Sequence, residues 1–195
     1  MLFTVFRGDG PLSVRLEGPR VYLCPPRMGD WKPWAQLREE SREFLVPWEP
    51  TWPHDALTRQ AFRRRLKAYN HEWRQGTGFS FLVYRLSDSG LMGGVTLSNV
   101  RRGVAQAASM GYWIGERFAR QGFMTEAVLA VVEFAFEELG LHRIEAACLP
   151  HNDPSRSLLL KVGFRQEGYA RQYLRINGKW QDHLLFELLR DDPRL

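Results

Sequence analysis

The stretch that decides the fold is GERFARQGFMTEAV, residues 115–128. The residues just before it, MGYWI at 110–114, read as a strand, and residues 125–136 place apolar side chains at helical spacing on a broad face. Between them lies a short basic turn that holds Arg117, Arg120 and Gly122. Free N–H groups at a helix N-terminus attract anions. The stretch therefore predicts an anion site at a strand–turn–helix junction, although a plain helix cap with solvated arginines has the same pattern.

Length and composition limit the class of protein. The 195 residues suit a single domain spanning 1–195, with its core at about 20–190. Hydrophobic residues at 44% and aromatic residues at 13% favour a globular chain over a disordered one. No apolar run approaches the ~20 residues of a membrane span, and the start lacks the pattern of a signal peptide. We therefore expect a cytoplasmic protein without membrane contact.

Charge and side-chain spacing exclude little by themselves. The formal net charge of +5 suits an anionic ligand without identifying one. The five histidines lack metal-ligand spacing, and we find no nucleic-acid-binding motif, so neither kind of site is expected. Cys24 and Cys148 sit in separate strand-like runs, which favours free thiols over a disulfide.

The order of predicted elements indicates one mixed α/β domain. Pro47, Pro50 and Pro53 argue against a helix or central strand at 46–53. A helix after residue 152 is capped by Asn152 or Asp153, with a proline at its first position, and is ended by Gly163. The other predicted elements are a strand at 21–24, one or two helices over 31–44 interrupted at Pro33, a helix at 57–73, strands at 79–86, 93–100 and 107–114, a helix running from the turn to Gly140, and strands at 143–149, 174–176 and 184–188.

Four ordered motifs carry a resemblance to a known family. They are FLVPWEP (44–50), GYWIGERFARQGFMTEA (111–127), HRIEAACLPHNDPSRSLLLKVGFRQEGYA (142–170) and INGKWQDH (176–183). Together they resemble the GNAT superfamily of acetyl-CoA-dependent N-acetyltransferases, and within it the bacterial ribosomal-protein-alanine N-acetyltransferases of the Rim type. The resemblance implies the GNAT fold, a mixed, mostly antiparallel twisted sheet flanked by helices, with splayed strands that bind acetyl-CoA.

In this family the turn and the helix start hold the pyrophosphate of coenzyme A. The family pattern is Gln or Arg, two variable residues, Gly, one variable residue, and Gly or Ala. Gly122 matches it, whereas Ala119 and Met124 depart from it. Backbone N–H groups do not depend on those side chains, and Arg117 or Arg120 can supply the charge. The resemblance implies cofactor contacts at Tyr112, Trp113, Ile114, Arg117, Arg120, Gln121, Gly122, Phe123, Met124, Thr125 and Asn152.

The resemblance also suggests the groups that carry the reaction. A backbone N–H from the segment Tyr112–Ile114 would stabilise the oxyanion. Ser155 falls where Rim-type enzymes place a serine that protonates the leaving thiolate, although it is also an ordinary polar residue of a first helical turn. A branch of N-terminal acetyltransferases has a catalytic glutamate on the strand before the asparagine, and by spacing that position is Ala147 here. Glu145, two residues away on the same side of the strand, therefore becomes the candidate base acting through water. A solvated glutamate at the end of a strand is the alternative reading of Glu145.

The acceptor is predicted to be the α-amino group of a protein N-terminus, an Ala or Ser of a ribosomal protein. Trp48 and Glu49 in the rigid FLVPWEP loop, and Tyr169 beside the closing hairpin, are the candidate substrate-binding residues, though an exposed glutamate in such a loop is usually just solvated. Two alternatives stay open. One is acetylation of a small amine such as an aminoglycoside, a polyamine or an amino acid, and the other is a non-catalytic module that binds coenzyme A.

Overall fold

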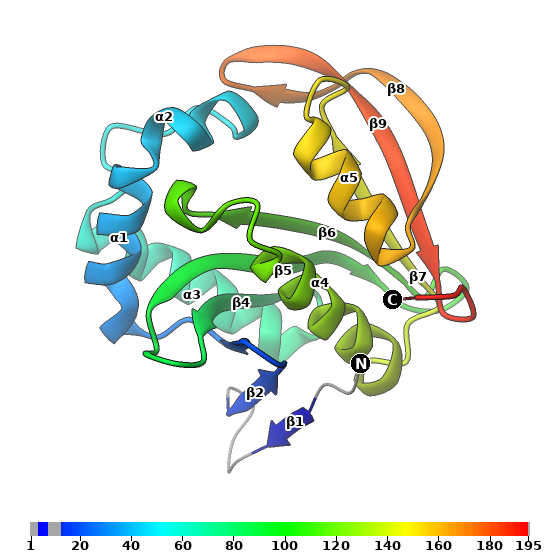
Figure 1. Ribbon diagram of the computed structural model, residues 1–195, viewed down its shortest axis with the longest axis horizontal. Helices are drawn as coiled ribbons and strands as arrows, with labels where there is room; N and C mark the ends of the chain where they lie inside the picture. The colour runs from blue at the N-terminus through cyan, green and yellow to red at the C-terminus, as the bar shows by residue number, and fades with distance from the viewer. Residues whose placement is uncertain (1–3, 8–12, 195) are drawn as a thin grey trace.

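The computed structural model describes residues 4–7 and 13–194, and the strands within them form one sheet (Figure 1). The order across that sheet is β1-β2-β3-β4-β5-β6-β7-β9-β8, and each pair is antiparallel except β6 with β7. The strands are β1 (Thr4–Arg7), β2 (Val14–Glu17), β3 (Val21–Cys24), β4 (Phe79–Arg85), β5 (Leu91–Arg101), β6 (Ala107–Ile114), β7 (Arg143–Cys148), β8 (Arg165–Ile176) and β9 (Lys179–Leu189). This is the mixed, mostly antiparallel sheet expected from the sequence.

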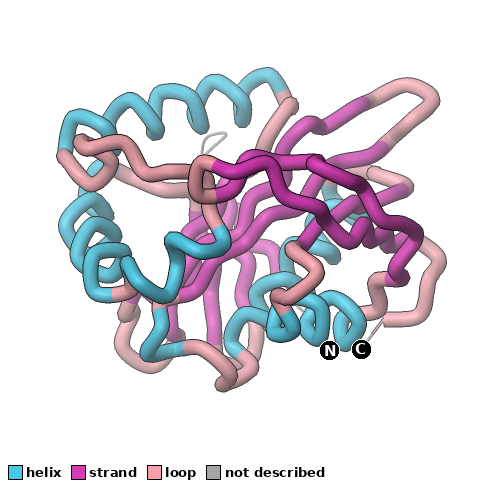
Figure 2. The backbone as a smooth tube through the Cα atoms, turned by 90° about the horizontal axis from the view of Figure 1, so that it is seen from above, coloured by secondary structure: helices cyan, strands magenta, loops and turns pink. Residues whose placement is uncertain are grey.

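Helices flank the sheet, which runs as one twisted layer through the molecule when seen from above (Figure 2). Most residues of β4 and β5 are buried without alternation, so both faces of these central strands are covered. The helices are α1 (Trp31–Glu40), α2 (Arg42–Leu45), α3 (Arg59–Gln75), α4 (Phe123–Glu133) and α5 (Asp153–Val162), with short 3-10 turns at Met28–Asp30, Val46–Trp48 and Glu116–Phe118 and a π-helical turn at Phe134–Glu138.

Aromatic side chains join α3, β4 and the end of α4 into one part of the core. The Trp73 ring lies 4.8 Å from Phe79 and 5.3 Å from Phe81, in edge-to-face geometry between ring centroids. Phe134 packs on both phenylalanines at 5.6 and 5.4 Å. Edge-to-face pairs add to the stabilisation from buried apolar area. This cluster fixes α3 against the sheet and so positions the helix face that borders the site described below.

Three predictions about proline were wrong in detail. Pro33 does not interrupt α1, because it occupies the first turn, where the backbone N–H has no intrahelical acceptor. The chain instead breaks between α1 and α2 at Ser41. Pro47 likewise sits in a single 3-10 turn at Val46–Trp48, so this part of the proline-rich segment is helical for one turn. Pro154 occupies the second position of α5 after the N-cap Asn152, rather than the first.

The sequence prediction missed a hairpin near the N-terminus and shortened another near the C-terminus. β1 and β2 pair with each other and extend the sheet beyond β3. β8 begins at Arg165, ahead of the predicted 174–176, and is broken by register shifts between Gln166 and Gly168 and between Ala170 and Leu174. Exposed side chains along most of β8 hide the alternation that would have revealed it. The long β8–β9 hairpin curves over the molecule toward α2 (Figure 1).

β6 and β7 separate where the sheet opens. Their parallel register runs from Ala107 opposite Arg143 to Met110 opposite Ala146 and then stops. β6 continues to Ile114 on β5, while β7 continues to Cys148 on β9. The remaining residues of the two strands therefore face each other across a gap with unpaired backbone groups. α5 begins just beyond the end of β7 and α4 just beyond the end of β6, so both helix starts adjoin this opening.

Candidate active site

The turn before α4 leaves the start of that helix open to a ligand. Gly122 adopts a left-handed conformation with φ of +83°, and Arg120 does so with φ of +60°. No side chain caps the helix, so its first N–H groups lack the partner that a capping oxygen would supply. Such a terminus is suited to an anion such as a phosphate.

Arg20 borders this turn and was not singled out from the sequence. Its Nε donates to Glu126 Oε1 at 2.5 Å, and its Nη2 donates to the Gln121 carbonyl at 3.2 Å. A Cβ at residue 122 would lie 3.1 Å from the Arg20 Nη2, so only glycine keeps the present spacing at this left-handed position. Arg20 is 106 residues from Glu126, and no local signal connects them.

Arg117 and Arg120, the two arginines predicted for the turn, differ in whether another side chain already pairs with them. Arg117 forms an ion pair with Glu40 of α1 at 3.3 Å and lies over the Phe118 ring. Arg120 is exposed, and within the described part of the chain its side chain makes no hydrogen bond or ion pair. Arg120 is thus the predicted cation that is available to an incoming phosphate without breaking an existing contact.

The gap between β6 and β7 presents backbone donors from the predicted oxyanion segment. Gly115 donates its N–H to the Met92 carbonyl at 2.8 Å, on the β5 side. Hydrogen bonding alternates along an antiparallel pair, so Trp113 also points its backbone groups at β5. Tyr112 and Ile114 then direct theirs into the gap. Within the segment 112–114, the candidate donors to the oxyanion are therefore the backbone N–H groups of Tyr112 and Ile114.

Ser155 and Tyr112 form a hydroxyl pair at this gap. Their Oγ and Oη atoms are 2.8 Å apart, and either can be the donor. The Tyr112 hydroxyl also lies 3.3 Å from the Ser155 carbonyl oxygen, to which it can donate. Asn152 accepts a hydrogen bond from the Ser155 N–H at 3.2 Å and so caps α5, which leaves its side-chain amide donors available. The tyrosine hydroxyl is a site group that sequence reasoning missed, because only the backbone of Tyr112 was considered.

Burial keeps the two titratable groups beside Ser155 protonated. It raises the pKa of Tyr112 far above its ordinary value, against a smaller lowering by the hydrogen bond with Ser155. Burial likewise raises the pKa of the Cys148 thiol, while Ser155 and the charge of Arg156 lower it. Both groups are therefore neutral near pH 7, and Ser155 faces hydroxyl and thiol donors instead of a charged base.

The structure does not bring Glu145 together with Ser155. The Glu145 carboxylate accepts hydrogen bonds from Arg101 Nη2 at 2.5 Å and from Arg143 Nε at 3.1 Å. Strand alternation places its side chain on the face of β7 opposite Cys148, whose thiol contacts Ser155. Glu145 is thus held in an arginine cluster away from the hydroxyl pair.

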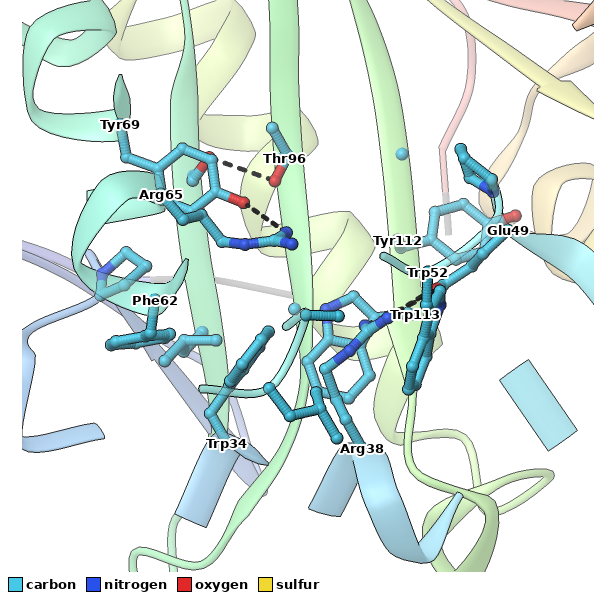
Figure 3. Close-up of a pocket in the computed structure, with 18 of the residues that line it drawn as sticks. Trp34, Arg38, Glu49, Trp52, Phe62, Arg65, Tyr69, Thr96, Tyr112 and Trp113 are labelled. Atoms are coloured by element: carbon cyan, nitrogen blue, oxygen red, sulfur yellow. Dashed lines mark hydrogen bonds and ion pairs between the residues drawn. The ribbon is translucent and has the colours of Figure 1, made fainter. Parts of the chain in front are cut away.

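Tyr112 also lines a cavity of about 560 Å³ (Figure 3). Residues of α1, α3, β4, β5 and β6 line it, together with the loop that follows α2. Its aromatic walls include Trp34, Trp52, Phe62 and Trp113. A volume in this range fits a ligand of drug size or the first residues of a peptide.

Glu49 lies in the wall of this cavity and is already engaged. Both carboxylate oxygens accept hydrogen bonds from Arg38, one of them at 3.2 Å, and Oε2 also accepts from Trp52 Nε1 at 2.7 Å. The Arg38 guanidinium packs near the rings of Trp52 and Trp113, at 4.3 and 4.8 Å. These contacts show that an ion pair, and not only its prolines, holds the FLVPWEP loop in place.

The FLVPWEP loop and the β8–β9 hairpin, the two segments that hold the candidate substrate-binding residues, meet at the edge of the cavity. The Asn177 N–H donates to the Glu49 carbonyl at 2.9 Å. Trp48 turns to the other side, where its ring lies 5.5 Å from His151 at the start of the α5 segment. Tyr169 does not line the cavity: it is 54% exposed, and its hydroxyl donates to Asp182 on the neighbouring strand.

Comparison with known proteins decides the family. The acetyltransferase (GNAT) domain family matches residues 20–165. The chain belongs to the GNAT acetyltransferases. It is 37% identical over 187 residues, 96% of either chain, to the ribosomal protein uS5-alanine N-acetyltransferase of Escherichia coli. It is 36% identical to the probable N-acetyltransferase YjcK of Bacillus subtilis, covering 91% of this chain and 98% of that one.

Solved structures agree with this assignment. The ribosomal-protein-S5-alanine acetyltransferase of Vibrio fischeri superposes with a TM-score of 0.85 at 31% identity, over 91% of this chain and 97% of that one. RimJ of Mycobacterium smegmatis, in complex with CoA-disulfide, gives a TM-score of 0.83 at 32% identity, over 96% and 86%. The chain is therefore a GNAT N-acetyltransferase related to the ribosomal-protein N-acetyltransferases, and GNAT enzymes use acetyl-CoA.

Two further observations concern the part of this GNAT chain that the structure describes. Among residues 4–7 and 13–194, no three His, Cys, Asp or Glu side chains gather as metal ligands. In the same residues, no helix has the length and apolar character needed to cross a membrane.

Proposed function

We propose that this GNAT enzyme transfers the acetyl group of acetyl-CoA to the α-amino group of a protein N-terminus, an Ala or Ser of a ribosomal protein. The observation that carries the proposal is the hydroxyl pair of Tyr112 and Ser155, placed between the β6–β7 gap and the large cavity. The cofactor reaches this pair from one side and the acceptor from the other. Acetylation of newly made ribosomal proteins fits the expected cytoplasmic location.

The residues present fit acetyl-CoA. The uncapped start of α4, with Gly122 at its N-cap and Arg120 unpaired, would hold the pyrophosphate. The amide donors of Asn152 and the unpaired groups of the gap would hold the pantetheine arm. Acetyl-CoA supplies the acetyl group and the thiolate that leaves. These assignments depend on donors that the protein presents without a partner of its own.

The protein groups then have separate tasks in the transfer. A backbone N–H of Tyr112 or Ile114 stabilises the negative charge that develops on the carbonyl oxygen. The Ser155 hydroxyl gives its proton to the departing sulfur, and the Tyr112 hydroxyl holds Ser155 in place and can return a proton to it. Because Glu145 is bound by two arginines, we assign removal of the amine proton to water in the cavity instead.

The acceptor side favours a peptide over a bare small amine. The cavity extends from Tyr112 on β6 to α3, and its volume of about 560 Å³ can hold the first residues of a peptide. Glu49 lines one side of it, and the β8–β9 hairpin supports this side from outside through the Asn177–Glu49 hydrogen bond. The E. coli relative is named as a ribosomal protein uS5-alanine N-acetyltransferase.

The test is a panel of peptides that differ only at the first residue, assayed by thiol release. Spermidine and an aminoglycoside are assayed beside them. We expect peptides with a free N-terminal Ala or Ser to react, and the same peptides with a blocked α-amine to be inert. Faster turnover of the small amines than of any peptide would move the acceptor to that class. Binding of acetyl-CoA without thiol release for any amine would indicate a non-catalytic module.

A further inference from the structure

The cavity beside Tyr112 carries one charge that its walls do not balance. Its charged lining residues are Arg38, Glu49 and Arg65, and Glu49 pairs with Arg38. The Arg65 guanidinium donates to the Tyr69 hydroxyl at 3.4 Å and lies 5.3 Å from the centre of the Trp34 ring. Within the described residues, no carboxylate contacts it. The cavity therefore keeps a net positive charge at the position of Arg65.

Arg65 lies at the end of the cavity away from the reaction. Figure 3 shows Arg65 and Tyr69 together beside Thr96, with Tyr112 and Glu49 on the opposite side. Thr96 pairs with Gly111 across β5 and β6, and Gly111 precedes Tyr112. A group bound at Arg65 thus shares the cavity with the reacting amine and is separated from it by at least the spacing of β5 and β6, about 4.8 Å, or one to two residues of an extended chain. In Figure 3 the apolar rings of Trp34 and Phe62 lie below Arg65, at the same end of the cavity.

We propose that Arg65 binds a carboxylate of the acceptor, so that the enzyme selects N-termini with an acidic side chain at the second, third or fourth residue. The proposal rests on the proposed function, because it assigns part of the same acceptor site. A guanidinium presents paired donors that match the two oxygens of a carboxylate. The carboxylate of a free amino acid has the same chemistry and is the other possible source.

The neighbouring cations of α3 provide a matched control. Arg64 is occupied by Asp55. Arg63 is exposed, as Arg65 is, and carries the same charge on the same helix, but it lies outside the cavity lining. A general attraction between the basic helix and an acidic peptide would involve Arg63 as much as Arg65. A contact inside the cavity would involve Arg65 alone.

The experiment compares peptides that begin with Ala or Ser and carry either Glu or Gln at position two, three or four. Wild-type enzyme, Arg65→Gln and Arg63→Gln are assayed by thiol release, after their melting temperatures show that all are folded. With wild type, we expect KM to rise about five- to tenfold when the preferred Glu becomes Gln, with little change in kcat. Arg65→Gln should raise KM for the Glu peptide by the same factor and abolish the Glu–Gln difference. Arg63→Gln should keep the difference.

Two further arms separate this proposal from the proposed function. Binding of a peptide labelled at its C-terminus, measured by anisotropy with coenzyme A present, needs no turnover. Free glutamate and aspartate are tested as acceptors in the same series. If the peptides are acetylated but KM changes neither with the Glu–Gln change nor with Arg65→Gln, the carboxylate site is refuted and the N-terminal function remains intact. A Glu preference that persists in Arg65→Gln also refutes it. Binding of acidic peptides, or turnover of free glutamate, that depends on Arg65 without peptide acetylation supports the carboxylate site and contradicts the N-terminal function.

Discussion

Glu49→Gln tests the ion pair that holds the acceptor wall. The Arg38 side chain is 8% exposed and the Glu49 side chain 21%, and three tryptophan rings surround the guanidinium. Removing one partner of a buried pair typically costs about 3–5 kcal/mol, because the remaining charge is left without a counter-ion. The glutamine keeps an oxygen that can accept from Arg38, and Glu49 is partly solvated, so we expect about 2–3 kcal/mol. For a chain of this length that lowers Tm by about 5–10 °C.

The matched control is Glu39→Gln. Glu39 pairs with Arg42 on the surface, with both side chains about half exposed, and we expect no measurable change in Tm. Differential scanning calorimetry gives both values under one condition. In the kinetic assay, Glu49→Gln should raise the peptide KM because the wall loosens, while acetyl-CoA affinity stays at the wild-type value. If the two variants melt alike, Arg38 is solvated and the ion pair does not hold the loop.

The remaining predictions concern the cofactor, the reaction and pH. Gly122→Asp adds a side chain against Arg20 and a negative charge at the start of α4, so acetyl-CoA affinity should fall at least about tenfold by calorimetry with the fold retained; wild-type affinity in the folded variant would place the pyrophosphate elsewhere. Ser155→Ala should lower kcat by about 10²-fold with acetyl-CoA binding unchanged, and an unchanged kcat, with chemistry rate-limiting, would assign the proton to another donor. Tyr112→Phe should lower kcat as well and add little to Ser155→Ala in the double variant, since the two hydroxyls act as a pair; additive losses would refute that. Burial raises the pKa of both Tyr84 and Tyr112, so the folded chain keeps phenolic protons that the unfolded chain loses above about pH 10. The contribution of these tyrosines to the free energy of unfolding is therefore fully present below that pH and falls above it. Urea unfolding at about pH 9 and about pH 11 should show this loss, and the loss should be smaller in Tyr84→Phe. An equal loss in that variant would contradict the role given to Tyr84.

Local signals explain which parts of the molecule the sequence could predict. The strand at 107–114, the turn at Gly122 and the cap at Asn152 depend on residues within one or two helical turns of each other. Periodicity, glycine and capping side chains act over that range, and the structure reproduces all three features. The resemblance added the fold, because it relates these local features to one another in a known order.

Contacts between distant segments explain what the sequence could not show. Arg20 contacts Glu126 of α4, which is 106 residues away in the sequence. Arg38 of α1 forms an ion pair with Glu49, which follows α2. Glu145 looked available because its partners Arg101 and Arg143 are brought to it only by the sheet. The Tyr112 hydroxyl on β6 contacts Ser155 on α5, and the two residues are 43 positions apart in the sequence. Each of these partners is an ordinary charged or polar residue until the fold places it.

The most direct test of the central claim is mass spectrometry of protein N-termini from cells with and without the gene. We expect a small set of N-termini to lose acetylation when the gene is deleted. These N-termini should begin with Ala or Ser and include at least one from a ribosomal protein. Wild-type enzyme should restore it, and the Gly122→Asp variant should not. An N-terminal acetylation pattern that is unchanged by the deletion, together with the loss of an acetylated small amine, would contradict the claim.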